Sequence, residues 1–277
     1  MTALAVAPEP PTGRSLVAAL MEELEQLPAS QAIALRVVQV VDDPATGAAD
    51  VAKAAGADPS LTARMLRVAN SAYYGLSGRV GTPAFAVTVL GFQTVRSLAA
   101  LSATGLVGTD SLPENFWDRA ASVASAASLL ARRVGADPPE AFCAGLLHDL
   151  GTALLRRQDP VLYDGLLARV AGGERMLRLE EVTYGGTHAS LCADVLTAWH
   201  FPRELCDAVG RHHDVPAPSA PPVRRALQAA VALVGTDDEG PDPTAALAAG
   251  FVRQDEVAEL SRQVAEAAEP LRAALAL

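Results

Sequence analysis

The chain has 277 residues, of which 50% are hydrophobic, 19% charged and 4% aromatic, a balance that excludes wholesale disorder and fibrous repeats. Its 22 basic and 32 acidic residues give a net charge of -10, so no global field draws it to nucleic acid or to an anionic membrane. No apolar run approaches the ~18 residues of a membrane span. Cys143, Cys192 and Cys206 are scattered and odd in number, which argues against a disulfide framework. We therefore expect a cytoplasmic protein with an aliphatic core.

Apolar residues recur at helical spacing along nearly the whole chain, which predicts an all-α fold. Residues 1–12 contain three prolines and are expected to be disordered. Helices are predicted to begin where a capping side chain precedes a proline, at Asp58, Thr82, Asp137 and Asp159. They are predicted to end at glycines that favour a left-handed conformation, at Gly75, Gly91, Gly135 and Gly172-Gly173.

The stretch of residues 105–113 is rich in Gly, Thr, Asp, Ser and Pro, and it is the best candidate for a boundary. We divide the chain there into an N-terminal helical subdomain, residues 13–110, and a second helical unit, residues 111–277. Gly91 is expected to split two helices, residues 82–90 and 93–106. A long helix is expected over residues 116–134. A final apolar stripe that starts at Val257 and includes Leu271 closes the core or mediates self-association.

One predicted helix, residues 141–155, is apolar or small except at His148, Asp149 and Thr152. Burial of an ionisable pair is costly unless it is partnered or bound to a metal. Adjacent His and Asp, about 100° apart around a helix axis, can reach one ion from neighbouring directions. A His-Asp pair within a buried helix is therefore a candidate metal or catalytic site.

Other histidines can converge on that pair. His188 lies at a predicted helix start, and His212-His213 close a helix that begins at Pro202. Helical spacing places His212 on the same face as Leu205, towards the core, and rotates His213 away from it. The alternative is that each histidine is a core or helix-terminal residue bonded to a carboxylate or carbonyl group.

A second constellation is a polar stripe at helical spacing, formed by Ser60, Arg64, Arg67 and Ser71. Two guanidinium groups on one face can hold a phosphate or a partner's carboxylate. The alternative is a solvated face that forms salt bridges to the acidic surface. The chain contains no G-x-S-x-G, no G-x-x-x-x-G-K and no paired CxxC motif.

The run Leu-Arg-Val-Ala-Asn-Ser-Ala-Tyr-Tyr-Gly at residues 66–75, followed by Ala-Val-Thr-Val-Leu-Gly at 86–91, resembles the signature of the HDOD family. The resemblance spans about residues 20–275 and includes His148-Asp149 and His212-His213. It implies an all-helical protein whose second half is an HD-like helical bundle, used in bacterial signalling and commonly without demonstrated catalysis. It adds Asn70, Ser71 and Tyr74 to Arg64 and Arg67 as candidate ligand- or partner-binding residues.

The resemblance also indicates which metal ligands of catalytic HD hydrolases this chain lacks. Catalytic HD hydrolases hold a divalent metal with a His, the His-Asp pair and a distant Asp. In this chain the first His is replaced by Arg119, the distant Asp falls near Val231, and Thr152 stands where many active members have lysine. We therefore expect a vestigial site, with no metal or other cofactor, formed by the residues His148, Asp149, His188, His212, His213 and Arg119.

Three hypotheses follow. The first is a non-catalytic signalling module that binds a protein partner or a small phosphorylated ligand; a homodimer is allowed, and no membrane is involved. The second is a metal-dependent phosphohydrolase that acts on nucleotides or cyclic dinucleotides, with a divalent transition metal held by His148, Asp149, His188, His212 and perhaps His213. The third and weakest is a nucleic-acid-associated regulator that uses Arg64, Arg67 and Arg96, against which the acidic charge counts.

Overall fold

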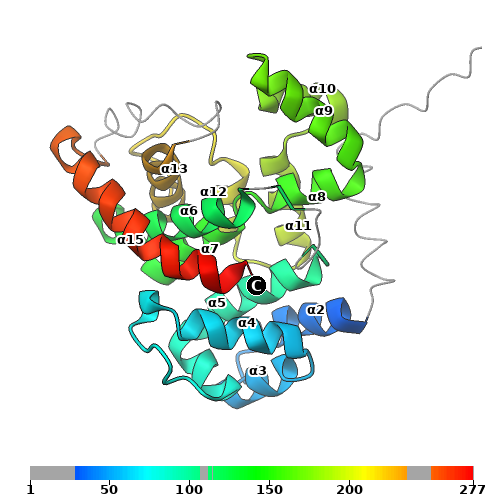
Figure 1. Cartoon of the computed structure of the whole chain (residues 1–277), viewed down its shortest axis with the longest axis vertical. Coiled ribbons are helices and arrows are strands. Elements are labelled where there is room, and N and C mark those ends of the chain that lie inside the picture. Colours follow the sequence, from blue (N-terminus) through cyan, green and yellow to red (C-terminus); the bar gives the residue numbers. More distant parts are fainter. Residues whose placement is uncertain (1–28, 107–111, 114, 236–250, 277) are drawn as a thin grey trace, which may run out of the picture.

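A computed structural model describes residues 29–106, 112–113, 115–235 and 251–276. Every regular element in these residues is a helix, which confirms the all-α prediction (Figure 1). The α-helices are α2 Ala29–Val41, α3 Ala48–Ala55, α4 Pro59–Ala69, α5 Pro83–Ala103, α6 Phe116–Ala131, α7 Pro138–Leu147, α8 Leu150–Gln158, α9 Pro160–Ala171, α10 Met176–Tyr184, α11 His188–Ala198, α12 Arg203–Gly210, α13 Pro222–Val234 and α15 Val257–Leu275. Three 3-10 helices are η1 Ala72–Tyr74, η2 Arg132–Val134 and η3 Gln254–Glu256.

Side-chain capping is found at three of the four helix starts that the sequence predicts. The Asp58 carboxylate accepts from the backbone N–H groups of Ser60 and Leu61, and the Thr82 hydroxyl accepts from the N–H of Phe85. Asp159 caps α9 in the same way. Asp137 precedes α7 without a side-chain cap. These starts are encoded within four residues, so they can be read from the sequence.

Helix α5 bends at Gly91, whose backbone lies at φ 76° and ψ 161°. This confirms the predicted split, because a residue with a Cβ rarely adopts a positive φ. Helix α5 is long and apolar enough to cross a membrane by length and composition alone, but 61% of the relevant stretch is buried inside the protein. It packs on α2, α3, α4 and α7, which is the position of a core helix.

Figure 1 shows α2–α5 at one end of the molecule and α6–α13 at the other, with α15 lying along α6 and reaching α4. One aliphatic core runs through both groups. Leu260, Val264 and Leu271 of the final stripe are buried, so this stripe closes the core. The predicted boundary near residues 105–113 lies largely outside the described residues, as do residues 1–12, and the division into subdomains stays a prediction.

The prediction of one helix over residues 141–155 is wrong. Helix α7 ends at Leu147 and α8 begins at Leu150, so His148 and Asp149 lie at a break where Asp149 has φ -98° and ψ 11°. The backbone of α11 passes against α8 at this point, since a Cβ built on Gly151 would lie 1.9 Å from the His188 carbonyl oxygen. An apolar sequence does not encode such a break, because a long-range contact determines it.

Candidate functional site

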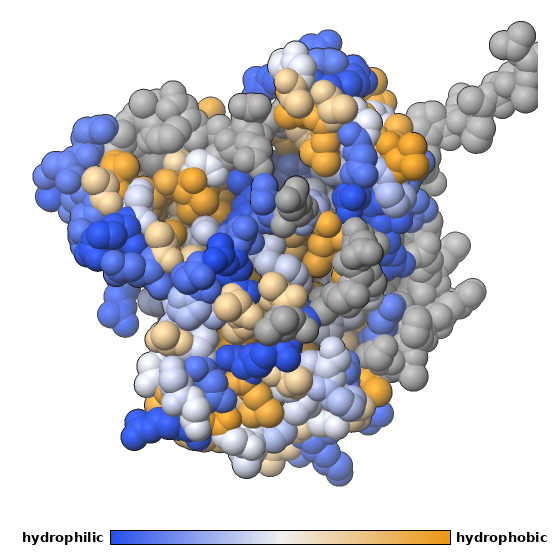
Figure 2. Space-filling view, viewed as in Figure 1, coloured by the Kyte–Doolittle hydropathy of each residue, from blue (hydrophilic) through white to orange (hydrophobic). Residues whose placement is uncertain are grey.

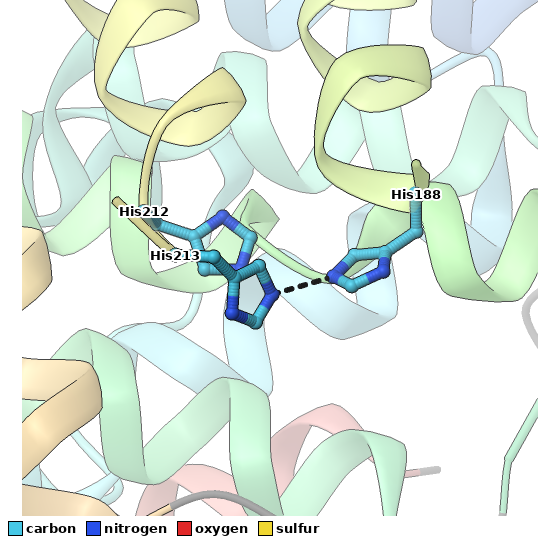
Figure 3. A group of neighbouring side chains, drawn as sticks. All are labelled: His188, His212 and His213. Carbon is cyan, nitrogen blue, oxygen red and sulfur yellow. Dashed lines mark hydrogen bonds between the residues drawn. The ribbon is translucent and has the colours of Figure 1, made fainter. Parts of the chain in front are cut away.

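Three segments bring the predicted site histidines and Asp149 together. His148 and Asp149 come from the α7–α8 junction, His188 is the first residue of α11, and His212 and His213 follow α12. We call these five residues the histidine cluster. His148 and His212 are fully buried, and His188 is 6% exposed. In Figure 3 the rings of His188, His212 and His213 point towards one another.

Asp149 lies at the centre of the cluster. Its carboxylate oxygens are 3.0 Å from Nε2 of His148, 3.8 Å from Nε2 of His188 and 4.0 Å from Nε2 of His212. The Nε group of Arg119, from α6, donates directly to Oδ2 of the same carboxylate. Burial alone raises the pKa of Asp149, but the Arg119 guanidinium and His148 hold that pKa well below its usual range. The carboxylate is therefore ionised and paired with a cation.

The histidines are oriented from outside the cluster. Nδ1 of His148 lies 2.7 Å from the Gly145 carbonyl oxygen, and Nδ1 of His212 lies 2.6 Å from that of Val209. A carbonyl only accepts, so both Nδ1 atoms carry the hydrogen, and in a neutral His212 ring Nε2 presents a lone pair to the interior. This is the arrangement that proteins use to fix metal-binding imidazoles.

Glu180 of α10 performs this role for His188 and was missed by the sequence analysis. Its fully buried carboxylate accepts from the His188 backbone N–H at 2.8 Å and lies 2.8 Å from Nδ1 of His188. The hydroxyl of Tyr163 in α9 donates to it at 2.9 Å. The only available sequence signal was an acidic residue eight positions before a histidine, which is common on exposed helices.

His188 and His213 share a hydrogen. Their Nε2 atoms are 2.9 Å apart, so one of them must donate (Figure 3). Burial opposes charge on His188, but Glu180 raises its pKa, whereas burial and His188 lower the pKa of His213 to about 3. These opposite shifts favour His188 as the donor. The predicted outward rotation of His213 is wrong, because α12 ends at Gly210 and helical periodicity does not extend to residue 213.

The four-ligand set that the resemblance implied does not fit a metal here. Arg119 holds Asp149, and Val231 is a buried aliphatic side chain in α13. A different set fits better, since ligand atoms of His188, His212 and His213 all lie within 4.8 Å of one another. Imidazole nitrogen is a suitable ligand for zinc, iron, nickel or copper.

A pocket of about 160 Å³ opens beside the cluster. Arg119, Asp149 and His213 line its polar end, and Thr152 lies there too. Apolar side chains of α6 and α9, including Phe116 and Leu167, form the other end. The pocket has room and polarity for a small ligand with one apolar portion.

The second predicted constellation lies elsewhere, at the contact of α4 with α6 and α15. Arg64 is 1% exposed and Ser71 is 7% exposed, so the solvated face that we considered is not found at these two residues. The side-chain amide of Asn70 donates to the carbonyls of Leu66 and Val80 and accepts from the Val80 N–H, and thereby braces the loop after α4. Tyr74 is half-buried in η1.

Arg96 joins the two ends of the molecule. It is 2% exposed, pairs with Asp42, and donates to the carbonyls of Trp199 and His200 at 3.2 and 2.6 Å. Its guanidinium also stacks 4.2 Å from the Phe201 ring. A nucleic-acid contact through Arg96 is therefore incompatible with this structure.

Comparison with known proteins identifies a family and several solved structures that this chain resembles. The HDOD domain model matches residues 27–215. A crystal structure of a candidate phosphohydrolase from Shewanella amazonensis SB2B is 28% identical, covers 93% of this chain and 98% of its own, and superposes with a TM-score of 0.68. An HDOD domain protein of unknown function from Geobacter sulfurreducens has 24% identity and a TM-score of 0.63, covering 95% of this chain and 98% of its own.

A curated protein of Treponema pallidum (strain Nichols), named only as uncharacterized, is 24% identical over 208 residues. The match covers 73% of this chain but only 40% of that relative. This chain therefore spans less than half the length of that curated relative.

Proposed function

This chain belongs to the HDOD domain family, and from that premise we propose that it is a non-catalytic regulatory module that binds a protein partner or a small phosphorylated ligand. The observation that carries the proposal is the direct ion pair between Arg119 and Asp149. The guanidinium places a fixed positive charge against the carboxylate of the His-Asp pair. A metal ion would have to displace that charge or tolerate its repulsion.

Charge balance supports the same conclusion. Two buried carboxylates lie in and beside the cluster, Asp149 and Glu180, and each pairs with a basic side chain, Arg119 and His188, whose pKa Glu180 raises. These two side chains supply the two positive charges that a divalent ion would otherwise bring. The cluster is thus electrically complete from the chain's own residues.

A hydrolysis screen tests the proposal. The full chain is incubated with nucleoside triphosphates and cyclic dinucleotides in the presence of Mg²⁺, Mn²⁺, Fe²⁺ or Ni²⁺. We expect no product beyond that of the His148→Ala variant. Metal-dependent turnover that disappears in His148→Ala would overturn the non-catalytic proposal.

The three convergent imidazoles favour a second candidate, a metal-dependent phosphohydrolase. His188, His212 and His213 would hold the metal, whose chemistry is to activate water for attack on phosphorus. The similarity to the Shewanella amazonensis protein adds to this candidate. It requires tight, stoichiometric metal binding that is lost in His212→Asn, together with turnover in the same screen.

A further inference from the structure

Arg64 is the buried charge that the proposed function does not use. Its side chain is 1% exposed, and neither Nε nor Nη1 has a hydrogen-bond partner among the described residues. Its guanidinium lies 5.3 Å from the ring of Trp117 in α6. Burial, followed by repulsion from Arg67, lowers the pKa of Arg64 to about 10 despite an opposing effect of Asp58. Arg64 therefore stays protonated at neutral pH, buried and unpaired, which is an unfavourable state.

Among the described residues Arg64 forms no ion pair, and the Asp58 carboxylate, which acts on its pKa, caps the start of α4. Arg67, one turn further along α4, donates from Nε to the Ala274 carbonyl at 3.4 Å. Ser71 is buried, and its hydroxyl has no partner. We call Arg64, Arg67 and Ser71 the arginine strip. Arg64 and Arg67 are three residues apart and lie on one side of α4, and Ser71 follows the helix just before η1. The strip offers several donors and contains no acidic side chain.

The end of α15 covers this strip. Leu271 and Leu275 are fully buried and Ala274 is 7% exposed, and α15 contacts α4, η1 and α6. Besides the Arg67 contact, the end of α15 is held by an ion pair between Arg272 and Asp118 at 3.0 Å. These two side chains are 42% and 49% exposed. An exposed pair of this kind contributes little. The cover is therefore held mainly by its apolar side chains, against an unpaired charge.

Helix α15 also contains a position at which its last turn can move away from the rest of the helix. Leu260, Val264 and Ala268 anchor the first part of α15 by their burial, while Pro270 lies inside the helix just before the covering turn. Proline has no N–H, so one intrahelical hydrogen bond is missing at this point. Figure 2 shows hydrophilic and apolar residues side by side on the outer face of α15, whereas the large apolar side chains of its last turn, Leu271 and Leu275, are buried.

We propose that residues 271–275 are a displaceable cover over a docking site for an acidic segment of a partner protein. Carboxylates of the partner pair with Arg64 and Arg67, and its apolar side chains fill the groove that Leu271 and Leu275 leave. A free inorganic anion satisfies the arginines but leaves that groove open to water, which is why a peptide segment is the favoured occupant. The proposal rests on the proposed function, because it names the kind of partner that the regulatory module binds.

The first test measures the unpaired charge in the full chain. Arg64→Met keeps the length of the side chain and removes the charge, so we expect a rise in Tm of about 2–4 °C and slower hydrogen exchange of the backbone amides of residues 271–275. Arg262→Met is the matched control, since Arg262 lies on α15 but is exposed and paired with Glu259 and Glu266. A lower Tm and faster exchange in Arg64→Met than in the control would show that Arg64 stabilises the closed form, and would overturn the proposal.

The second test measures docking with a defined probe, an amidated peptide of residues 266–276 that carries Arg272→Glu. Trp117 fluorescence or calorimetry reports its binding. Leu271→Ala in the protein weakens the cover, so we expect the peptide to bind about tenfold more tightly. Arg272→Ala leaves no cavity and should also strengthen peptide binding. The double variant Leu271→Ala/Arg64→Met should bind the peptide about tenfold more weakly than Leu271→Ala alone.

Equal affinities in all variants, or affinities that ignore Arg64, would overturn the docking site. Stabilisation by inorganic phosphate without peptide binding would also overturn it, in favour of a simple anion site. Neither result alters the hydrolysis screen, so failure of this inference and failure of the proposed function are distinguishable. Turnover in that screen would remove the regulatory role even if the peptide bound.

Discussion

The histidine cluster and the arginine strip bury charged groups in opposite ways. In the cluster, Asp149 pairs with Arg119, and His188 pairs with Glu180 beside it, although Nε2 of His148 and of His212 has no hydrogen-bond partner among the described residues. In the strip, the buried Arg64 guanidinium forms no ion pair with any described residue, and its Nε and Nη1 have no hydrogen-bond partner there. Paired charges rigidify a fold, whereas an unpaired charge leaves free energy for a partner to recover. Under the proposal made above, the cluster holds the structure together and the strip is where a partner binds.

The largest expected effect is at the centre of the cluster. Asp149→Asn leaves Arg119 without a counter-charge in a setting where the two side chains are only 18% and 11% exposed. Loss of one partner of a buried pair costs about 3–5 kcal/mol of the free energy of unfolding, measured by urea denaturation.

Asp214→Asn is the control for this variant, because Asp214 is 56% exposed and pairs loosely with Arg211. Equal losses in Asp149→Asn and Asp214→Asn would break the comparison between a completed cluster and an incomplete strip. Arg64→Met should shift stability in the opposite direction from Asp149→Asn.

The next effect concerns the backbone contact that positions His188. Gly151→Ala places a Cβ 1.9 Å from the His188 carbonyl oxygen, so α8 and α11 must separate. We expect a loss of about 1–3 kcal/mol in the same denaturation experiment. Gly165→Ala in α9 has open space around the new Cβ and should gain about 0.5–1 kcal/mol instead. Similar effects for both variants would mean that the close approach is not required.

The pH dependence of the free energy of unfolding is expected to be a smaller effect, per pH unit, than the substitutions above. The pKa values of His212 and His213 are lowered in the folded protein, to about 3 for His213, chiefly by burial. Below the unfolded pKa of about 6.5, the unfolded chain binds protons that the folded chain does not, so stability falls by about 1.4 kcal/mol per pH unit for each histidine. His188, whose pKa is raised, contributes stability below 6.5 that is lost as pH rises through its folded pKa.

Denaturation at pH 7 and pH 5 measures this slope. His213→Gln should flatten it, because one of the two depressed groups is removed. His200→Asn should leave it unchanged, since His200 is exposed and its φ of 60° suits asparagine. An unchanged slope in His213→Gln would show that His213 titrates normally.

The sequence predicts features that depend on a few neighbouring residues. The starts of α4 and α5, the bend at Gly91, and the position of His188 at the beginning of α11 all follow from capping groups and glycine. The convergence of His188 and His212 on the His148-Asp149 pair was also anticipated, because His188 begins one predicted helix and His212-His213 close another.

Features that depend on distant residues were not predictable. The break at His148-Asp149 arises from contact with α11, and Glu180 becomes a partner of His188 only through the packing of α10. Arg64 has the sequence context of a surface residue, and its burial depends on Trp117, more than 50 positions away in the chain, and on α15. The pattern of polar and apolar residues predicts which side chains share a face of a helix, but only the tertiary structure determines whether another element buries that face.

The most direct test of the central claim is metal titration of the wild-type chain and of Arg119→His, with Mn²⁺ or Ni²⁺ binding followed by calorimetry and elemental analysis. Arg133→His on the exposed η2 segment controls for the gain of a histidine. If Arg119 blocks the site, Arg119→His binds the ion at least about tenfold more tightly than the wild type and Arg133→His. A wild-type chain that already holds a stoichiometric ion with the affinity of Arg119→His would contradict the account.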